Sequence, residues 1–390
     1  MTRREGRWGQ LVLGGLAVLA LLAACTKGGS VAAPSAGSSP GAPPSAQTSS
    51  AATGLLFGSL PAGCDGVAAP PTSSVISFAA AGRIWSFSPD PPGELHCLFT
   101  QGNPGLFSWG PRGDRVVLAG LQVRGVGSAA ARPAGSFQPS YFSWSRPSGT
   151  TVVFTDQARH NLFRADIGVA TTSDITPVPG VTYGDIAYHP SGLAIGFEAT
   201  DSSGSAIWMS TNTGKNPQLL VRAPSGTTFA HIVFAHDGVS LYYSIDRADG
   251  THTLARYDLP TGKVSDGLWK GSAPIADIVE LAGVPGLALT LGATCTDRQA
   301  VYSDLEGGPG TPLGAGLTGP VSVVGRVDRD RFVVATGGCG GAPQDLSMAY
   351  RSGGPPSALL VRSVDVAAMR QPEPTPAPPL PQNLPRSGFA

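Results

Sequence analysis

One strand–turn–strand pattern recurs through the middle of this 390-residue chain, and it constrains the fold more than any other feature. Each copy has an alternating strand, a turn in which Pro or Asp comes shortly before Gly, and a second apolar strand. The clearest copies are residues 107–118, 142–154, 186–197 and 232–243. Equivalent aromatic residues follow one another at intervals of 35, 44 and 46 residues: Trp109, Trp144, Tyr188 and Phe234. Periods in the forties with several short strands per unit are typical of β-propeller blades.

Weaker copies extend the pattern to both sides. Residues 278–291 and 321–335 repeat the two strands without the Pro/Asp–Gly turn, and 75–99 supplies strands for one more unit. We expect 358–361 to help that unit close the ring. A further alternating strand recurs at 84–87, 161–166, 206–210, 254–258 and 300–304. The sequence therefore predicts an all-β fold: a single propeller of six or seven four-stranded blades, with seven favoured. A pair of β-sandwiches is the alternative, but it would not require such a period.

These copies resemble the WD40-like repeats of TolB-type propellers, in which an aromatic strand is followed by Ser-Pro-Asp-Gly or a variant and then by a second apolar strand. The resemblance covers most of residues 75–365. It implies the propeller fold but no particular activity, because the turn is degenerate in every copy. Some propellers of this type precede a peptidase domain. Only about 20 residues follow the last blade here, so we expect no hydrolase domain in this sequence.

The N-terminus has the features of an export signal. Arg3, Arg4 and Arg7 precede an apolar run over 11–24, which is too short to span a bilayer comfortably. The run ends in Leu-Ala-Ala-Cys at Cys25, which resembles the bacterial lipobox. We expect cleavage before Cys25 and lipidation of its thiol. Fatty acyl chains there would hold the protein on the extracytoplasmic side of a cell membrane without spanning it. The alternative is an ordinary secretory signal with a chance cysteine.

Composition divides the rest of the chain. Residues 1–24 form the expected signal peptide, and 25–54 the lipidated cysteine with a flexible Ser/Ala/Pro/Gly tether, which has too little apolar surface to fold. The propeller is expected over 55–370. Residues 371–390 are Pro-rich and are expected to form an extended or disordered tail, with a Pro-rich docking peptide as the alternative.

Four further cysteines indicate disulfides, because an even number in an exported chain is usually paired. The pairing that we favour is Cys64–Cys97 and Cys295–Cys339, since each pair is local and would brace one end of the folded region. Four unpaired structural thiols are the alternative. The sequence contains no Cys-x-x-Cys, which argues against a redox motif or a zinc ribbon.

Charge and motif content exclude several functions. Charged residues make up 13% of the chain and the formal net charge is zero, which argues against nucleic-acid binding. Residues 55–370 contain no Gly-x-Ser-x-Gly, and the six histidines are scattered, so we expect no metal and no cofactor. His231 and His236 are the closest pair worth weighing. We interpret His236, like His189 one repeat earlier, as a turn residue bonded to its own backbone.

Three ionisable residues occupy equivalent positions at the entry to successive repeats. They are Asp185, His231 and Asp277, and such positions often face the propeller axis or one rim. We expect any ligand site at this mouth of the channel, although exposed loop residues remain the alternative. The sequence favours a membrane-tethered scaffold that binds an envelope protein or a glycan. A propeller enzyme of the lyase, lactonase or glycan-hydrolase kind is the second hypothesis.

Overall fold

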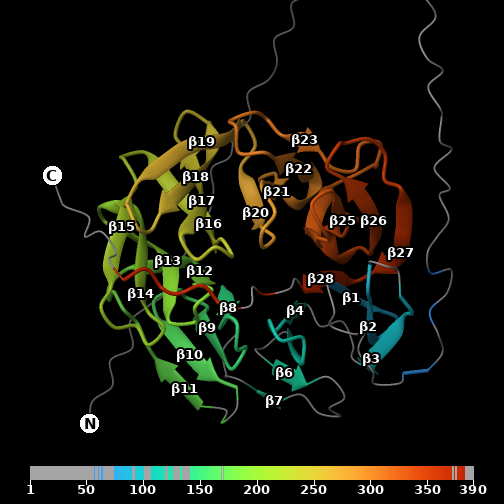
Figure 1. Cartoon of the computed structure of the whole chain (residues 1–390), viewed down its shortest axis with the longest axis horizontal. Helices are drawn as coiled ribbons and strands as arrows, with labels where there is room; N and C mark the ends of the chain where they lie inside the picture. The colour runs from blue at the N-terminus through green and yellow to red at the C-terminus, as the bar shows by residue number, and fades with distance from the viewer. Residues whose placement is uncertain are drawn as a thin grey trace, which may run out of the picture. The chain divides into compact units, whose positions relative to one another are not determined.

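The computed structural model describes residues 57, 60, 63–64, 74–89, 93–100, 107–118, 122–125, 132–133, 141–167, 169, 171–370, 373 and 376–382. All of them belong to the compact unit Ser50–Ala390. Their strands form seven antiparallel four-stranded sheets, which are arranged as blades around a common axis (Figure 1). The fold is therefore the expected β-propeller, and the blade count is seven. The expected signal peptide, Cys25 and the expected tether over 25–54 lie outside the described residues.

The blades follow chain order, and the strands of each blade are named from the channel outward. Blade 1 consists of β28 (Val366–Arg370), β1 (Val75–Ala80), β2 (Arg83–Phe87) and β3 (His96–Thr100). Blade 2 consists of β4 (Phe107–Trp109), β5 (Arg115–Leu118), β6 (Gln122–Gly125) and β7 (Arg132–Pro133). Blade 3 consists of β8 (Phe142–Trp144), β9 (Thr151–Thr155), β10 (Leu162–Asp166) and β11 (Thr171–Asp174). Blade 4 consists of β12 (Thr182–Tyr188), β13 (Ala194–Asp201), β14 (Gly204–Thr211) and β15 (Gln218–Arg222).

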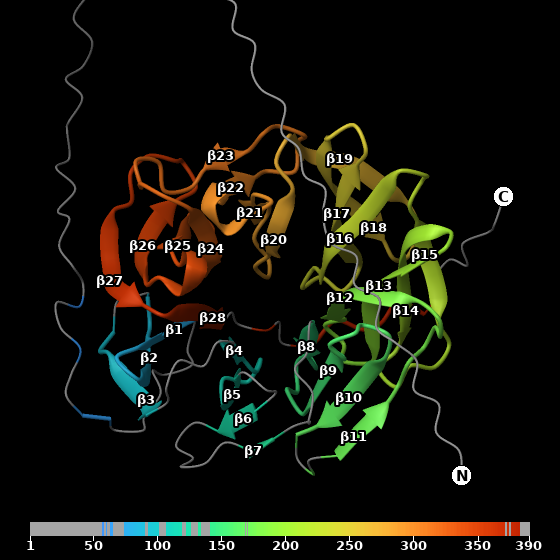
Figure 2. The ribbon, with the colours of Figure 1, turned by 180° about the vertical axis from the view of Figure 1, so that it is seen from behind.

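The remaining three blades complete the ring, which Figure 2 shows from its other face. Blade 5 consists of β16 (Thr227–Phe234), β17 (Ser240–Arg247), β18 (His252–Asp258) and β19 (Val264–Gly271). Blade 6 consists of β20 (Ile275–Val279), β21 (Leu287–Leu291), β22 (Gln299–Ser303) and β23 (Thr311–Pro312). Blade 7 consists of β24 (Val321–Arg326), β25 (Arg331–Gly337), β26 (Gln344–Tyr350) and β27 (Ala358–Val364). Two 3-10 turns, η1 (Cys295–Asp297) and η2 (Cys339–Gly341), follow β21 and β25.

The recurring motif forms the turn between the first and second strands of a blade. In blade 5, the Gly238 N–H donates to the Ala235 carbonyl over 3.1 Å, and Gly238 has a φ of +70°, which favours glycine. Asp237 accepts hydrogen bonds from the N–H groups of Val239 and Ser240 over 2.8 and 3.0 Å. The Asp–Gly pair thus fixes the turn. The corresponding turns of blades 2 to 7 lie at one end of the channel, which we call the turn face.

The aromatic anchors end the innermost strands of four successive blades. Trp109, Trp144, Tyr188 and Phe234 are each the last residue of their strand, and all four are buried. Apolar clusters fill the spaces between blades, as where Ile207 and Leu220 of blade 4 pack with Phe229 and Tyr243 of blade 5. Each blade therefore buries its apolar faces against its neighbours.

The ring is closed by a strand from the far end of the chain. β28 pairs with β1, with Ala367 opposite Phe78, so blade 1 combines the beginning and the end of the described propeller. Our assignment of 358–361 to this closure was wrong: these residues belong to β27, the outermost strand of blade 7. Their apolar character has another cause, because Leu360 and Val361 pack in one cluster with Phe78 of blade 1.

Both predicted disulfides are present. Cys64 is bonded to Cys97 in β3, with their Cα atoms 4.6 Å apart, and Cys295 is bonded to Cys339 with a Cα separation of 5.5 Å. The second bridge joins η1 of blade 6 to η2 of blade 7. Among the described residues, no helix is long and apolar enough to cross a membrane.

Candidate functional site

A cavity of about 370 Å³ lies in the channel at the turn face. Residues from the inner strands and turns of at least five blades line it, including Trp109, Trp144, Arg146, His236, Glu280 and Arg370. Glu373, three residues beyond the closing strand, also lines it. Its volume is within the range of small-ligand sites, and its lining combines aromatic rings with charged groups.

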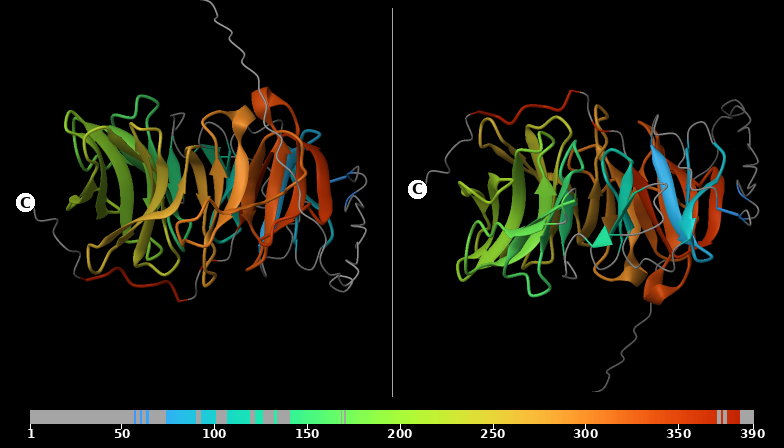
Figure 3. Two further views of the ribbon diagram at one scale, coloured as in Figure 1. Left: turned by 90° about the horizontal axis from the view of Figure 1, so that it is seen from above. Right: turned by 90° about the horizontal axis from the view of Figure 1, so that it is seen from below.

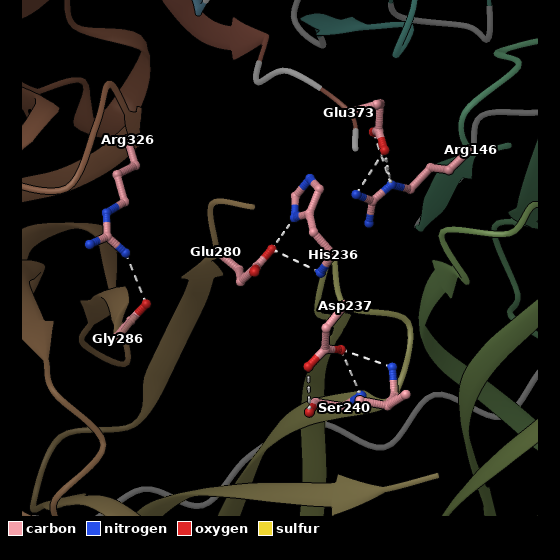
Figure 4. Close-up of polar contacts among 9 residues, drawn as sticks. Arg146, His236, Asp237, Ser240, Glu280, Gly286, Arg326 and Glu373 are labelled. Carbon is pink, nitrogen blue, oxygen red and sulfur yellow. Dashed lines mark hydrogen bonds and ion pairs between the residues drawn. The ribbon is translucent and has the colours of Figure 1, made fainter. Parts of the chain in front are cut away.

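Arg146 and Glu373 form an ion pair at this cavity (Figure 4). The Arg146 Nε atom lies 2.9 Å from both carboxylate oxygens of Glu373, and Nη2 lies 2.9 Å from Oε2. Their side chains are only 14% and 17% exposed. A charge-assisted contact that is this dry is stronger than an ordinary surface salt bridge. It ties the chain beyond β28 to the turn of blade 3.

His236 and Glu280 form a second pair, between the turns of blades 5 and 6 (Figure 4). The imidazole Nδ1 bonds the Glu280 carboxylate, and the backbone N–H of His236 donates to the same oxygen over 3.2 Å. Our interpretation of His236 as bonded to its own turn was therefore wrong, because the neighbouring blade supplies its partner. His189 does receive the N–H of Ser191 in its own turn, and its Nε2 lies 2.7 Å from the Gly238 carbonyl.

Trp144 lines the cavity as one of its aromatic walls. Its side chain is buried, and its indole Nε1–H has no hydrogen-bond acceptor among the described residues. A buried donor without an acceptor is unfavourable.

The predicted residues Asp185, His231 and Asp277 lie near the middle of the innermost strands β12, β16 and β20. Asp185 and His231 lie within an irregularity in the pairing of their strand with the next, and Asp277 borders one. Asp185 and Asp277 each accept the N–H of the following residue over 2.8 Å. The structure thus places all three at one level of three consecutive blades. Whether they bind a ligand stays a prediction.

These groups influence one another electrostatically. Burial raises the pKa of Asp185 to about 7, and the charges of Asp277 and Glu198 act in the same direction. Burial also raises the pKa of Glu198 to about 7. The position of Asp277 inside the channel raises the pKa of its carboxyl, and the Ile278 N–H and the charge of His231 oppose this rise. Because the side chain is exposed to solvent, the rise is a weak one. Burial lowers the pKa of His231.

A second cavity of about 300 Å³ lies at the end of the channel opposite the turn face. Asp277, Arg298 and Gln344 line it, but Asp185 and His231 do not. Of the three predicted residues, Asp277 alone lines this second cavity. No group of three or more His, Cys, Asp or Glu side chains within the described part of the chain has the geometry to hold a metal ion.

The charged residues of the turn-face cavity were not predicted. Arg146, Glu280, Arg370 and Glu373 come from distant parts of the sequence. One signal was available: Arg146 follows closely after the strand that ends in an aromatic anchor, and Arg370 ends the closing strand itself. Glu373 had no such signal, because it lies in a segment expected to be disordered.

Comparison with known proteins gives the fold and no family. No protein-family model matches the sequence, and no curated protein matches it. Among solved structures, an oligogalacturonate lyase in complex with manganese is similar with a TM-score of 0.53 and 11% identity, over 69% of this chain and 82% of that one. A prolyl endopeptidase is similar with a TM-score of 0.50 and 13% identity, over 77% of this chain. This chain spans half the length of that peptidase.

TolB proteins are also among the structural neighbours. TolB from Acinetobacter baumannii is 16% identical, with a TM-score of 0.44, over 76% of this chain and 83% of that one. All these identities are low, so the likeness concerns the propeller fold alone.

Proposed function

We propose that this protein is a lipid-anchored binding module of a bacterial envelope, and that it receives its partner at the turn-face cavity. The observation that carries the proposal is the cavity's lining. Two tryptophans from adjacent blades stand beside charged groups that are already paired, Arg146 with Glu373 and His236 with Glu280. Paired charges and aromatic walls form a preorganised recognition surface.

Anchoring by Cys25 would set the geometry of this binding. The tether over 25–54 leaves the propeller close to the extracytoplasmic side of the cell membrane, where an envelope protein or glycan is within reach. Metabolic labelling with an alkyne-bearing fatty acid tests the anchor directly. The parent protein should be labelled and Cys25→Ala should not. Equal labelling of both would contradict lipidation at Cys25.

Site-specific photo-cross-linking tests the binding site. A benzophenone amino acid replaces Phe142, which lines the cavity, or Val169, which is 69% exposed on the outer part of blade 3. In intact envelopes we expect an intermolecular cross-linked product from position 142 only, and less of it when Cys25 is also changed to Ala. Equal products at both positions, or none at 142, would refute the cavity as the binding site.

A second candidate function is an enzyme with its site at Asp185 on the innermost strand of blade 4. It is favoured by Asp185 and Glu198, whose pKa values near 7 are suited to a general acid or base. Changing Asp185 to Asn would abolish such an activity and leave cross-linking from position 142 unchanged. That pair of results would separate the two functions.

A further inference from the structure

A segment beyond the propeller crosses the turn face and lies next to the cavity. We call Glu373 together with residues 376–382 the C-terminal strap. It leaves β28 in blade 1 and lies across blades 4 and 5, as the red segment over β12–β14 in Figure 1 shows. The side views in Figure 3 place it flat against one face of the disc.

Three contacts hold the strap on this face. Glu373 pairs with Arg146 in blade 3. Pro378 lies so close to Gly238 that a Cβ atom added there would be 2.8 Å from the proline Cβ. Leu380 packs against the apolar cluster between blades 4 and 5. The strap is thus an extended, Pro-rich peptide bound to its own propeller through one carboxylate, one proline and one leucine.

The first of these contacts occupies Arg146, one of the two arginines that line the cavity. Arg146 projects its guanidinium to the Glu373 carboxylate, and both residues line the cavity. Arg370 lines it too. Burial lowers the pKa of Arg370, and the nearby charge of Glu373 opposes this by favouring the charged guanidinium. This wall of the cavity therefore presents donors suited to a carboxylate, and the strap supplies one.

We propose that the turn face binds an extended peptide segment of a partner protein that carries an acidic side chain, and that the C-terminal strap is the built-in competitor for that site. The proposal rests on the proposed function and names its ligand class and its regulation. An incoming carboxylate takes the place of Glu373 on Arg146. A Pro-rich segment suits this exchange because it is already extended when free. Little conformational entropy is therefore lost when such a segment, from the strap or from a partner, binds.

The test measures binding of a fluorescent peptide with the sequence of residues 371–382 to the full-length protein. Glu373→Gln weakens the strap and leaves Arg146 in place, so we expect this variant to bind the peptide about tenfold more tightly than the parent. Glu306→Gln makes the same charge change at an exposed loop position and should bind like the parent. Adding Arg146→Gln to Glu373→Gln should weaken binding at least tenfold, as should replacing the peptide's glutamate with glutamine.

Two results would overturn the proposal. One is equal peptide affinity in the parent and Glu373→Gln proteins. The other is equal affinity of the acidic and glutamine peptides for Glu373→Gln. Thermal melting shows whether the Arg146 variant is folded, and Arg146→Lys, which keeps the charge but loses the two-pronged contact, should bind with intermediate affinity.

Cross-linking from position 142 separates this proposal from the proposed function. If the partner is still captured there but Glu373→Gln does not increase the yield, the strap proposal fails and the binding module stands. If nothing is captured there in either protein, the proposed function fails. Capture of an acidic glycan with no peptide binding would overturn the peptide assignment alone.

Discussion

Arg326 of blade 7 donates a hydrogen bond of 2.9 Å from Nη1 to the carbonyl of Gly286, which lies in the turn of blade 6 (Figure 4). The arginine is fully buried. Its other nitrogens donate to the carbonyls of Pro285, Asp328 and Arg329 over 3.0 Å each, and its guanidinium lies 5.1 Å from the ring centroid of Phe332. One side chain therefore joins the turns of two blades.

Replacing Arg326 with Met should destabilise the protein strongly. The substitution leaves several buried carbonyls without donors, and we expect a loss of about 3–5 kcal/mol in the free energy of unfolding. Urea denaturation measures it. Arg362→Met, at an exposed position of β27, should change the free energy by less than about 0.5 kcal/mol. Similar values for the two variants would show that the carbonyl contacts of Arg326 contribute nothing.

Removing the bridge between blades 6 and 7 should lower stability without unfolding the ring. The two cysteines are 44 residues apart. For a loop of this length, the loss of chain entropy in the unfolded state predicts a stabilisation of about 4 kcal/mol, and measured stabilisations are often smaller. We expect Cys295→Ser with Cys339→Ser to lose about 2–4 kcal/mol in denaturant melts. Far-ultraviolet circular dichroism should keep its β-sheet form. A double variant with unchanged stability under non-reducing conditions would contradict this expectation.

Stability should fall as the pH rises from about 4.5 to 7, in part because of Glu198. Burial raises the pKa of this carboxyl to about 7 in the folded protein. The folded state then binds more protons than the unfolded state in this window, so the free energy of unfolding decreases with pH and levels off above about 7. Glu198→Gln should reduce the decrease by on the order of 2 kcal/mol between pH 4 and 8.

Urea melts at several pH values measure the Glu198 effect, with Glu306→Gln as the control that keeps the full slope. Asp185 titrates in the same window, so a reduced slope should remain in Glu198→Gln. A slope identical to that of the parent would mean that Glu198 is ionised with its ordinary pKa in the folded protein.

Two glycines with the same backbone conformation should respond differently to alanine. Gly238 and Gly250 have φ values of +70° and +77°, so each alanine costs about 1 kcal/mol of backbone strain. Only at Gly238 does the new Cβ meet the strap, at Pro378, whereas nothing lies within 4 Å at Gly250. We expect Gly238→Ala alone to release the strap, seen as faster proteolysis after the closing strand. Equal cleavage in both variants would place the strap elsewhere.

The repeat architecture could be predicted from the sequence because blade formation is local. The aromatic anchor, the Asp–Gly or Pro–Gly turn and the second apolar strand lie within about a dozen residues of one another. The turn requires a positive φ at residue 238, and the glycine at this position in the sequence indicates that requirement. The same holds for the cysteine pairs, because pairs close in sequence belong to the same or to adjacent blades.

Ring closure and the turn-face cavity were decided only by the tertiary structure. An apolar run such as 358–361 has the same pattern whether it closes a ring or packs against the next blade, so the pairing of β28 with β1 could not be recognised. Arg146 and Glu373 are 227 residues apart, and no local pattern relates them. Local sequence determines each blade, but the contacts across the channel depend on how seven blades meet around one axis.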